Sequence, residues 1–543
     1  MNDQIMKIRW LGAALFWLIP IIILSQNQQD GTSQISKKSF SPTLSFLSSG
    51  WMEGREAGER GSFMASDYIA AMMETIGLQP YGDIAAAKGD KTRSYFQTFE
   101  MLRYKAENAS FSFISEKPGS RMEQKLTRDI DFEVEPGLRS IEVQAPVVFA
   151  GYGIYAPELG YDDYKKTDVN GCIVVVLKGF PGHRDSTSYA AKKLPATFGR
   201  DFANAETKLR NAFTRGAVAL IIVQAQKTPA FFGGKAKNSD LLKNVMNAEK
   251  EPEPKYTDEF YHVVYGDDEA PMIPLFRLSD EAKAKLFVGT EISFNDFEKK
   301  AAESLSESSV PIKGKSIGIS VTVNVEKLLV RNVLGLIPGQ DSTKNIIIGA
   351  HYDHLGIRIG NIYNGADDNA SGTAGMLALA KFWSESAQKP ACNLVFAAWT
   401  AEEKGLLGSS YFVDHNKVNP SNTMLKINFD MISRSAPEDS TGFIVSVGTV
   451  KGSDNLKTLA NKSNQLLATP FALDLWECSE HGGSDYAPFA GRKVPVMTFF
   501  SGFHDDYHTT RDISTKVDLN KMESILKLAN GCLEGFMEEL QGK

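Results

Sequence analysis

The run Asn345-Ile-Ile-Ile-Gly-Ala350 is apolar along almost its whole length and ends directly before His351. A run of this kind, without alternating polar side chains, predicts a strand that is buried on both faces of a parallel sheet. Further apolar runs follow in the chain, and carboxylates or a histidine come after each of them. The runs are 393–399, 424–429 and 495–500, and the residues after them are Glu402 with Glu403, Asp430, and His508.

These polar residues predict a single site, because sites in open α/β sheets form outside the carboxyl ends of the strands. Asp368 joins them from the segment Asp367-Asp368-Asn369, which is typical of a turn before a helix. A helix is expected over residues 372–386, where apolar positions suit one buried face. We therefore predict a three-layer α/β sandwich with a mixed, mostly parallel sheet and helices on both faces.

The candidate ligands combine imidazoles with carboxylates and include no thiolate, which suits Zn²⁺, or Mn²⁺ or Co²⁺ as substitutes. They are too many for one catalytic zinc, which keeps about three protein ligands and an open position. They fit two ions if one carboxylate bridges, and two ions about 3.5–4 Å apart can polarise a carbonyl. Glu402 is then left free as a general base. The candidate ligands are His351, Asp368, Glu403, Asp430 and His508.

Several stretches resemble the co-catalytic zinc aminopeptidases of the M28 family and occur in that family's order. The resemblance implies that Asp368 bridges two metals, that Glu402 is the base and that Glu403 is a ligand. It also implies that Asp353 supports His351 through a hydrogen bond, and that the peptide bond after Asp368 is cis. The stretches are 349–353, 364–372, 401–409, 428–431 and 506–508.

The same resemblance implies an exopeptidase that binds two Zn²⁺ and removes N-terminal residues from peptide substrates. A water shared by the metals would lose a proton to Glu402 and attack the scissile carbonyl, and Glu402 would return the proton to the leaving amine.

Other functions of the same fold remain open at this point. A dinuclear carboxypeptidase or dipeptidase would need a cationic pocket for the substrate carboxylate, for which Arg434, Arg492 and Arg511 are candidates. A single-zinc glutaminyl cyclase and a non-enzymatic, receptor-like protein are weaker alternatives, because every ligand position of the M28 pattern is present.

The composition agrees with a globular enzyme. The 543 residues suffice for on the order of two or three domains. A net charge of −7, with no P-loop or GxGxxG element, gives no indication of nucleic acid as a partner. The four cysteines are too few and too scattered for a disulfide framework. Cys172 and Cys392 adjoin predicted buried strands and are expected to be free thiols, whereas Cys478 lies near the predicted site, where a ligand role is open.

The N-terminus predicts export from the cytoplasm. Lys7 and Arg9 precede an apolar run over residues 11–24, and polar residues follow it. A run of this length fits a secretory signal peptide and is short for a membrane span, which needs about 20 residues. We expect residues 1–25 to be a signal peptide, with no stable membrane span after cleavage and a periplasmic or extracellular location. An uncleaved anchor is the alternative.

The remaining sequence predicts a divided catalytic domain. Apolar residues recur at helical spacing between Phe63 and Ile76, which predicts an amphipathic helix that Gly77 ends. We assign residues 38–142 and 314–543 to the catalytic domain. We also expect residues from about 40 to 113 to share one core with residues from about 313 onward, because the apolar strands need cover on both faces.

Residues 143–313 are expected to form an insertion between these parts. A glycine-bounded strand over 170–179, a helix over 208–217 and a strand over 218–223 resemble the β-rich protease-associated (PA) domain often inserted in this family. The polar stretch 224–265 departs from a compact PA domain, and its role is open.

Overall fold

The computed structural model describes residues 35–84, 92–117, 119–198, 201–225, 259–264, 273–307 and 309–542. The predicted signal peptide and most of the polar stretch 224–265 lie outside these ranges. Within them, no helix combines the length and the apolar character that a membrane crossing requires. The chain divides into two compact units, and we call residues 1–99 with 329–543 unit 1 and residues 100–328 unit 2.

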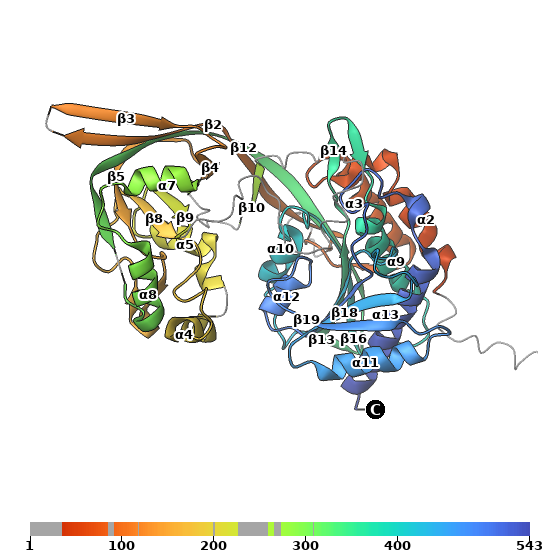
Figure 1. The fold of residues 1–543 in the computed structure, drawn as a ribbon. Helices are drawn as coiled ribbons and strands as arrows, with labels where there is room; N and C mark the ends of the chain where they lie inside the picture. The colour runs from red at the N-terminus through yellow and green to blue at the C-terminus, as the bar shows by residue number, and fades with distance from the viewer. Residues whose placement is uncertain are drawn as a thin grey trace, which may run out of the picture. The chain divides into compact units, whose positions relative to one another are not determined.

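Unit 1 is built on one mixed sheet (Figure 1). Strand β13 (Asp341–His351) pairs in parallel with β16 (Cys392–Trp399) and with β17 (Thr423–Phe429), and β17 pairs in parallel with β20 (Val496–Phe500). The carboxyl ends of these four strands therefore meet at one edge of the sheet. The sheet also contains β18 (Ile444–Val450), β19 (Ala472–Cys478), β1 (Gln79–Pro80) and the last part of β12 (Val310–Ile337).

Successive side chains of these strands enter two different cores, as the pleat of a strand requires. Ile346 and Ile348 belong to one core, whereas Ile347 belongs to the other together with Trp399. Helices cover both faces, so the predicted three-layer α/β sandwich is confirmed. One face carries α2 (Lys37–Leu47), α3 (Arg60–Thr75), α9 (Gly372–Ser384), α11 (Asp454–Gln465) and α13 (Leu519–Leu540), and the other carries α10 (Leu407–His415) and α12 (Ala487–Gly491).

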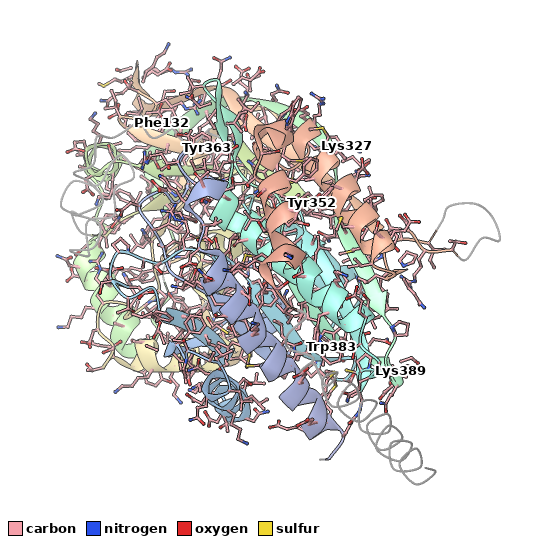
Figure 2. The ribbon with its side chains drawn as sticks, turned by 90° about the vertical axis from the view of Figure 1, so that its right-hand side faces the viewer. Phe132, Lys327, Tyr352, Tyr363, Trp383 and Lys389 are labelled. Atoms are coloured by element: carbon pink, nitrogen blue, oxygen red, sulfur yellow. The ribbon has the colours of Figure 1, made fainter. Side chains whose placement is uncertain are left out.

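The N-terminal segment contributes to the first of these cores. Helix α3 is the predicted amphipathic helix, and its Ile69 and Met73 are buried in the same core as Ile346. On the same face, Trp383 of α9, labelled in Figure 2, donates a hydrogen bond of 3.0 Å to Asn530 of α13. The expectation of a shared core with the later segment is therefore confirmed for α3.

The same expectation is wrong for the end of that segment. Phe111 and Phe113 belong to the core of unit 2, because β2 (Phe96–Lys117) continues into that unit. There β2 pairs with β3 (Ser120–Leu126) and with β10 (Glu259–Val263). The boundaries of the compact units, at residues 100 and 328, consequently differ from the predicted 143 and 313.

Unit 2 has a mixed sheet and cores of its own. Neighbouring strands β5, β8, β9 and β11 pair in parallel, with β12 and β4 antiparallel at the two ends. Helix α5 packs on one side and α4, α7 and α8 pack on the other. The bounds are β4 (Phe132–Glu135), β5 (Ile141–Phe149), β8 (Ile173–Leu177), β9 (Ala219–Val223), β11 (Leu275–Leu278), α4 (Tyr189–Phe198), α5 (Ala205–Phe213), α7 (Asp280–Phe287) and α8 (Phe294–Ser304).

The four cysteines of the chain are buried and unpaired. Cys172 and Cys392 therefore carry the buried free thiols that the sequence predicts. Burial raises the pKa of Cys478 to about 12, which disfavours the thiolate that a metal ligand requires. Cys478 also belongs to none of the metal-binding groups found among the described residues.

A buried ion pair joins α13 to the loop before β18. Lys521 Nζ lies 2.9 Å from Asp439 Oδ2, and both side chains are almost inaccessible. Burial acts to raise the pKa of Asp439, but hydrogen bonds from Lys521, the Ile444 N–H and Thr441 hold it well below its usual value. A carboxyl with a depressed pKa stabilises the fold above its unfolded pKa of about 4, and this stabilisation is lost as the pH falls below that value.

We expect Asp439→Asn to lower the free energy of unfolding of unit 1 by about 3 kcal/mol near pH 7, because it leaves the Lys521 charge buried without a counter-charge. The stability of this variant should also fall less steeply than that of the wild type below about pH 4. Urea unfolding followed by tryptophan fluorescence measures both effects, since every tryptophan of the described residues lies in unit 1. The exposed Asp454 provides the control variant Asp454→Asn, and equal pH dependence in all three proteins would contradict the expectation.

Candidate metal centre

The parallel strands deliver the predicted ligands to one edge of the unit 1 sheet. His351 ends β13, Glu402 and Glu403 follow β16, and Asp430 follows β17. Asp368 lies in η5 (Ala366–Ser371), and its peptide bond to Asn369 is cis, as the resemblance implied. The structure brings the side chains into three overlapping groups whose ligand atoms lie within 4.8 Å of one another. The groups are His351 with Asp368 and Asp430, His351 with Glu402 and Glu403, and His354 with Asp368, Glu403 and His508.

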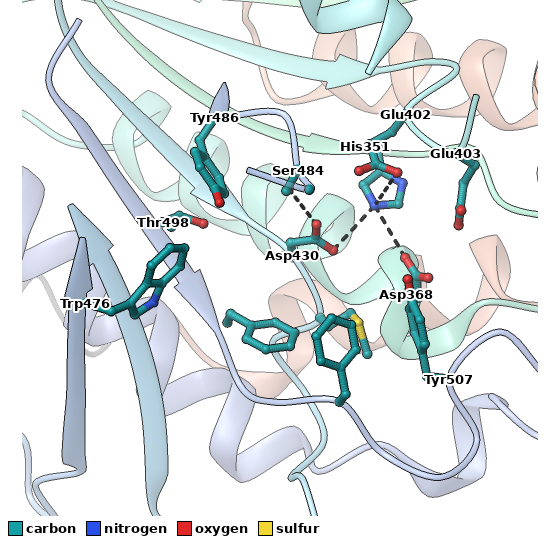
Figure 3. A pocket seen from close by; sticks show the side chains of 14 residues that line it. His351, Asp368, Glu402, Glu403, Asp430, Trp476, Ser484, Tyr486, Thr498 and Tyr507 are labelled. Atoms are coloured by element: carbon teal, nitrogen blue, oxygen red, sulfur yellow. Dashed lines mark hydrogen bonds and ion pairs between the residues drawn. The ribbon is translucent and has the colours of Figure 1, made fainter. Parts of the chain in front are cut away.

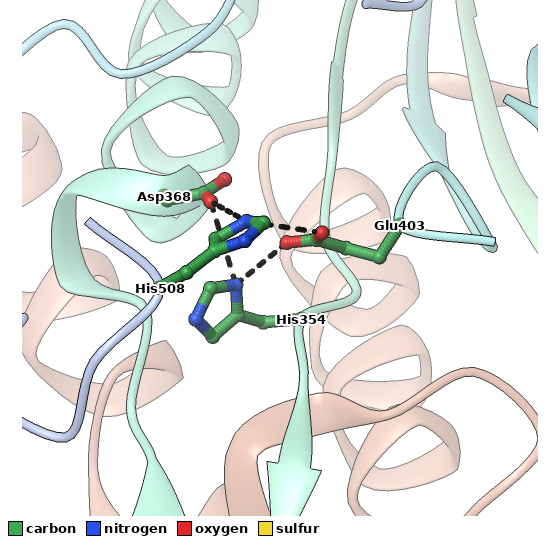
Figure 4. A group of neighbouring side chains, drawn as sticks. All are labelled: His354, Asp368, Glu403 and His508. Carbon is green, nitrogen blue, oxygen red and sulfur yellow. Dashed lines mark hydrogen bonds and ion pairs between the residues drawn. The ribbon is translucent and has the colours of Figure 1, made fainter. Parts of the chain in front are cut away.

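The carboxylate of Asp368 faces a different histidine with each of its oxygens. Oδ1 lies 3.4 Å from His351 Nε2, and Oδ2 lies 3.1 Å from His508 Nε2. Asp430 Oδ1 is 3.4 Å from His351 Nε2, and Glu403 Oε2 is 3.2 Å from His508 Nε2. Ligand atoms that surround a tetrahedral zinc at about 2.0–2.1 Å stand about 3.3 Å apart. The spacing therefore fits two ions, one beside each oxygen of Asp368 (Figures 3 and 4).

The cluster also has polar atoms and charges that the surrounding protein does not satisfy. His508 Nε2 is buried and has no hydrogen-bond partner, although two carboxylate oxygens lie close to it. Buried charges in proteins are paired or coordinate metals, and here the carboxylates outnumber the imidazoles. The donor set therefore fits divalent cations. The carboxylates, all buried or nearly so, are Asp353, Asp368, Glu402, Glu403 and Asp430.

The electrostatic surroundings of the two adjacent glutamates differ. Burial raises the pKa of Glu402 well above its usual value, with Glu403 and Asp430 acting in the same direction and His351 opposing them. Burial also acts to raise the pKa of Glu403, but the hydrogen bond from His354 and the neighbouring imidazole of His508 lower it well below its usual value. In the metal-free cluster the surroundings therefore favour the protonated form of Glu402 and the ionised form of Glu403. A divalent cation beside Glu402 favours its ionised form.

Asp353 contacts the cluster differently from the expectation. The hydrogen bond from His351 Nδ1 goes to the backbone carbonyl of Asp353 at 3.2 Å, whereas the carboxylate Oδ1 lies 3.9 Å away. The carboxylate accepts instead the backbone N–H groups of Glu402 and Glu403, at 3.1 and 3.4 Å. Asp353 therefore fixes the loop that carries the two glutamates.

Sequence reasoning missed three residues that support the cluster. Ser484 donates a hydrogen bond of 2.6 Å to Asp430 Oδ2, and His354 Nδ1 lies 2.8 Å from Glu403 Oε1. The fully buried Arg55, at the end of η2 (Gly50–Arg55), donates to the carbonyls of Tyr352 and Gly365, whose segments carry His351 and Asp368. The position of His354 directly after the stretch 349–353 was an available signal, but no local pattern connects Ser484 or Arg55 to the ligands.

A cavity of about 240 Å³ opens beside the cluster (Figure 3). The predicted ligands other than His508 form part of its wall together with Glu402, and apolar and aromatic side chains form most of the rest. Among the described residues, no lysine or arginine lines it. Arg434 and Arg511 pair with Asp506 at 2.9 and 2.7 Å, and Arg492 pairs with Asp414. The apolar and aromatic lining residues are Met431, Trp476, Tyr486, Phe500, Phe503 and Tyr507.

Comparison with known proteins assigns this part of the chain to a family. Residues 332–531 match the sequence profile of Peptidase family M28. This segment belongs to peptidase family M28. The M28 segment includes His351 and His508 and every predicted ligand between them.

Curated relatives of the M28 segment include leucine aminopeptidase 2 of Trichophyton equinum, 31% identical over 195 residues, which are 34% of this chain and 37% of the relative. Leupeptin-inactivating enzyme 1 of Streptomyces exfoliatus is 32% identical over 175 residues, 32% of this chain and 36% of the relative. Aminopeptidase YwaD of Bacillus subtilis is 28% identical over 185 residues, 33% of this chain and 38% of the relative. The matches thus span less than two-fifths of these relatives.

The chain also resembles a solved structure over most of its length. The aminopeptidase from Aneurinibacillus sp. strain AM-1 superposes with a TM-score of 0.55 at 19% identity, covering 92% of this chain and 94% of that one. Because the identity is low, this likeness establishes the fold alone. It agrees with the α/β sandwich that the strand pairing shows.

Proposed function

We propose that this protein is a zinc aminopeptidase that binds two zinc ions and removes apolar residues from the N-termini of peptides. The observation that carries the proposal is Asp368, whose two oxygens lie 3.4 and 3.1 Å from the Nε2 atoms of different histidines. Asp368 would be shared by both ions. His351 and Asp430 would complete one half of the site, and Glu403 and His508 the other. The names of the relatives of the M28 segment support aminopeptidase activity.

The residues around the ions suggest how the chemistry proceeds. Zinc bound here would supply Lewis acidity toward the scissile carbonyl and lower the pKa of an attacking water. Glu402 has no ligand role in this scheme, and its Oε2 lies 3.9 Å from His351 Nε2, at the wall of the cavity. Glu402 accepts a proton from the attacking water and donates it to the leaving amine. The Asp353 carboxylate accepts a hydrogen bond from the backbone N–H of Glu402 and so holds Glu402 in place.

The lining of the cavity favours an aminopeptidase over the alternatives. A carboxypeptidase or dipeptidase must bind a substrate carboxylate, and the described lining residues include no lysine or arginine. Arg434, Arg492 and Arg511, the sequence candidates for this task, are each paired with an aspartate elsewhere. A single-zinc cyclase does not require two histidines that share Asp368 between them. A receptor-like protein requires no metal ligands at all.

Metal analysis combined with a substrate panel tests the proposal. We expect two zinc ions per chain and hydrolysis of leucine p-nitroanilide, with no hydrolysis of its N-acetylated form. N-blocked dipeptides with a free carboxylate test for a carboxypeptidase, free dipeptides test for a dipeptidase, and an N-terminal glutaminyl peptide tests for a cyclase. Cleavage of the N-blocked substrates, or fewer than two ions in active protein, would overturn the proposal.

Two further parts of the proposal concern the rest of the chain. We propose that unit 2 contains a protease-associated domain, which its own cores and its parallel strands β5, β8 and β9 support. We also propose that the protein acts outside the cytoplasm, which the basic residues and the apolar run near the N-terminus support. N-terminal sequencing of protein recovered from outside the cytoplasm tests the second point.

The aromatic side chains that line the cavity predict which N-terminal residue of a peptide is preferred. We expect Phe500→Ala to reduce the preference for leucine over alanine p-nitroanilide by about tenfold, because it removes apolar surface from the cavity wall. The ratio of kcat/KM values for the two substrates measures this effect. Phe443 is partly exposed and does not line the cavity, so Phe443→Ala should leave the ratio unchanged. An unchanged ratio in Phe500→Ala would show that the leucine side chain of the substrate does not bind against Phe500.

A further inference from the structure

We propose that His354 is a positioning residue for one half of the metal centre. It donates its Nδ1–H to Glu403 Oε1, so that Glu403 presents only Oε2 to the ion shared with Asp368 and His508. This inference rests on the proposed dinuclear function and adds a residue that the M28 ligand set does not contain. Figure 4 shows the four side chains converging from separate segments.

The contact itself has the geometry of a hydrogen bond. His354 Nδ1 lies 2.8 Å from Glu403 Oε1 and 3.6 Å from Asp368 Oδ2. The side chain of His354 is fully buried, so no solvent competes for Glu403 Oε1 at this position. A carboxylate that binds a cation is ionised, and an ionised carboxylate only accepts hydrogen bonds. The proton of the contact therefore lies on His354 Nδ1.

This hydrogen bond gives the two oxygens of Glu403 different tasks. Oε2 lies 3.2 Å from His508 Nε2, which is the spacing of two ligand atoms on one ion, about 3.3 Å. Oε1 is engaged by His354 on the other side. Glu403 would thus offer one oxygen to a bound ion, which would leave room for water or substrate.

The imidazole occupies a slot that the neighbouring backbone provides. Gly365 has a φ of 55°, and a Cβ at this position would lie 2.6 Å from ring carbons of His354 and 2.1 Å from the carbonyl oxygen of Asp368. The backbone N–H of His354 donates to the carbonyl of Arg55 at 3.3 Å. The ring is therefore held between Gly365 and Glu403, and its orientation is fixed before any metal binds.

A direct ligand role for His354 is the competing interpretation, because its Nδ1 belongs to a group that can hold a metal. The distance of 2.8 Å to Glu403 Oε1 is shorter than the spacing of about 3.3 Å between ligands of a zinc ion. A ligand role would also require Nδ1 to lose the proton that satisfies Glu403. The geometry therefore favours the donor role, and the two roles predict different results for an asparagine variant.

The test compares His354→Leu with His354→Asn in the full chain. Leucine fills the slot without a donor, whereas the amide nitrogen of asparagine can take the place of Nδ1. Zinc affinities are measured by competition with a chelator, and Co²⁺-loaded protein reports ligand geometry by visible absorption. We expect His354→Leu to weaken one of the two ions by about 10–100-fold and to change the Co²⁺ spectrum. His354→Asn should recover most of the affinity and the wild-type spectrum.

The controls separate this inference from the proposed function and from a loss of stability. Leu533 is buried in the core of unit 1 on α13, so Leu533→Ala should lower the melting temperature while both zinc affinities stay at the wild-type value. Wild-type protein that binds fewer than two ions would overturn the proposed function. Wild-type protein with two ions, together with an unchanged affinity in His354→Leu, would overturn this inference alone. An asparagine variant as weak as the leucine variant would also overturn it, in favour of a direct ligand.

Discussion

Glu402→Gln is expected to lower kcat by at least about 10²-fold, while the zinc content stays near two ions per chain. The amide of glutamine cannot accept and return the proton of the attacking water, but it occupies nearly the same volume as the carboxylate. Burial raises the pKa of Glu402 well above its usual value, with Glu403 and Asp430 adding to the effect. Burial thus favours a proton on Glu402 in the metal-free site, whereas the charge of bound cations would favour its ionised form.

Glu403→Gln is the matched comparison, because the two glutamates are adjacent in the chain and in the same loop. We expect it to lose metal, since its Oε2 lies 3.2 Å from His508 Nε2 and its carboxylate is ionised. Zinc content by mass spectrometry and kcat with leucine p-nitroanilide distinguish the two variants. If both variants lost metal equally, or if both kept metal and activity, the assignment of base and ligand would be wrong.

The distinction between these glutamates could be predicted from the sequence only through the resemblance to M28 enzymes. The placement of the ligands, in contrast, follows from physical pattern. The apolar runs that end at His351 and before Asp430 required parallel strands with cover on both faces, and parallel neighbours place their ends at one edge. Local sequence therefore determined which segments meet.

Local sequence patterns could not predict the contacts between segments that are distant in the chain. The apolar residues Phe111 and Phe113 indicate a strand with a buried face, but not which core buries it, and they lie in unit 2. Arg55 is separated from Gly365 by 310 positions, and only the folded chain brings its guanidinium to that carbonyl. His351 donates to the backbone carbonyl of Asp353, and the Asp353 carboxylate accepts from Glu402 instead. The sequence spacing is the same in either arrangement, so it could not predict which of the two groups contacts His351.

Asp368→Asn is expected to have the largest effect of any single substitution at the site. The variant keeps one oxygen but replaces the other with an amide NH₂ group, which cannot bind a cation. Because the two oxygens face His351 and His508 separately, the variant can serve at most one ion well. We expect less than two zinc ions per chain and a loss of kcat/KM of at least about 10³-fold, since a Lewis acid contributes several kcal/mol to such a reaction.

Asp367→Asn is the control variant for Asp368→Asn. Asp367 is adjacent, equally buried and also acidic, but its carboxylate accepts hydrogen bonds from the N–H and hydroxyl of Ser433 at 2.8 and 2.7 Å. An asparagine oxygen can still accept these bonds, so the variant should keep two zinc ions, although its melting temperature falls. The difference in zinc content then depends on which aspartate points between the histidines. Two zinc ions in Asp368→Asn, or equal losses in both variants, would mean that Asp368 does not bridge the centre.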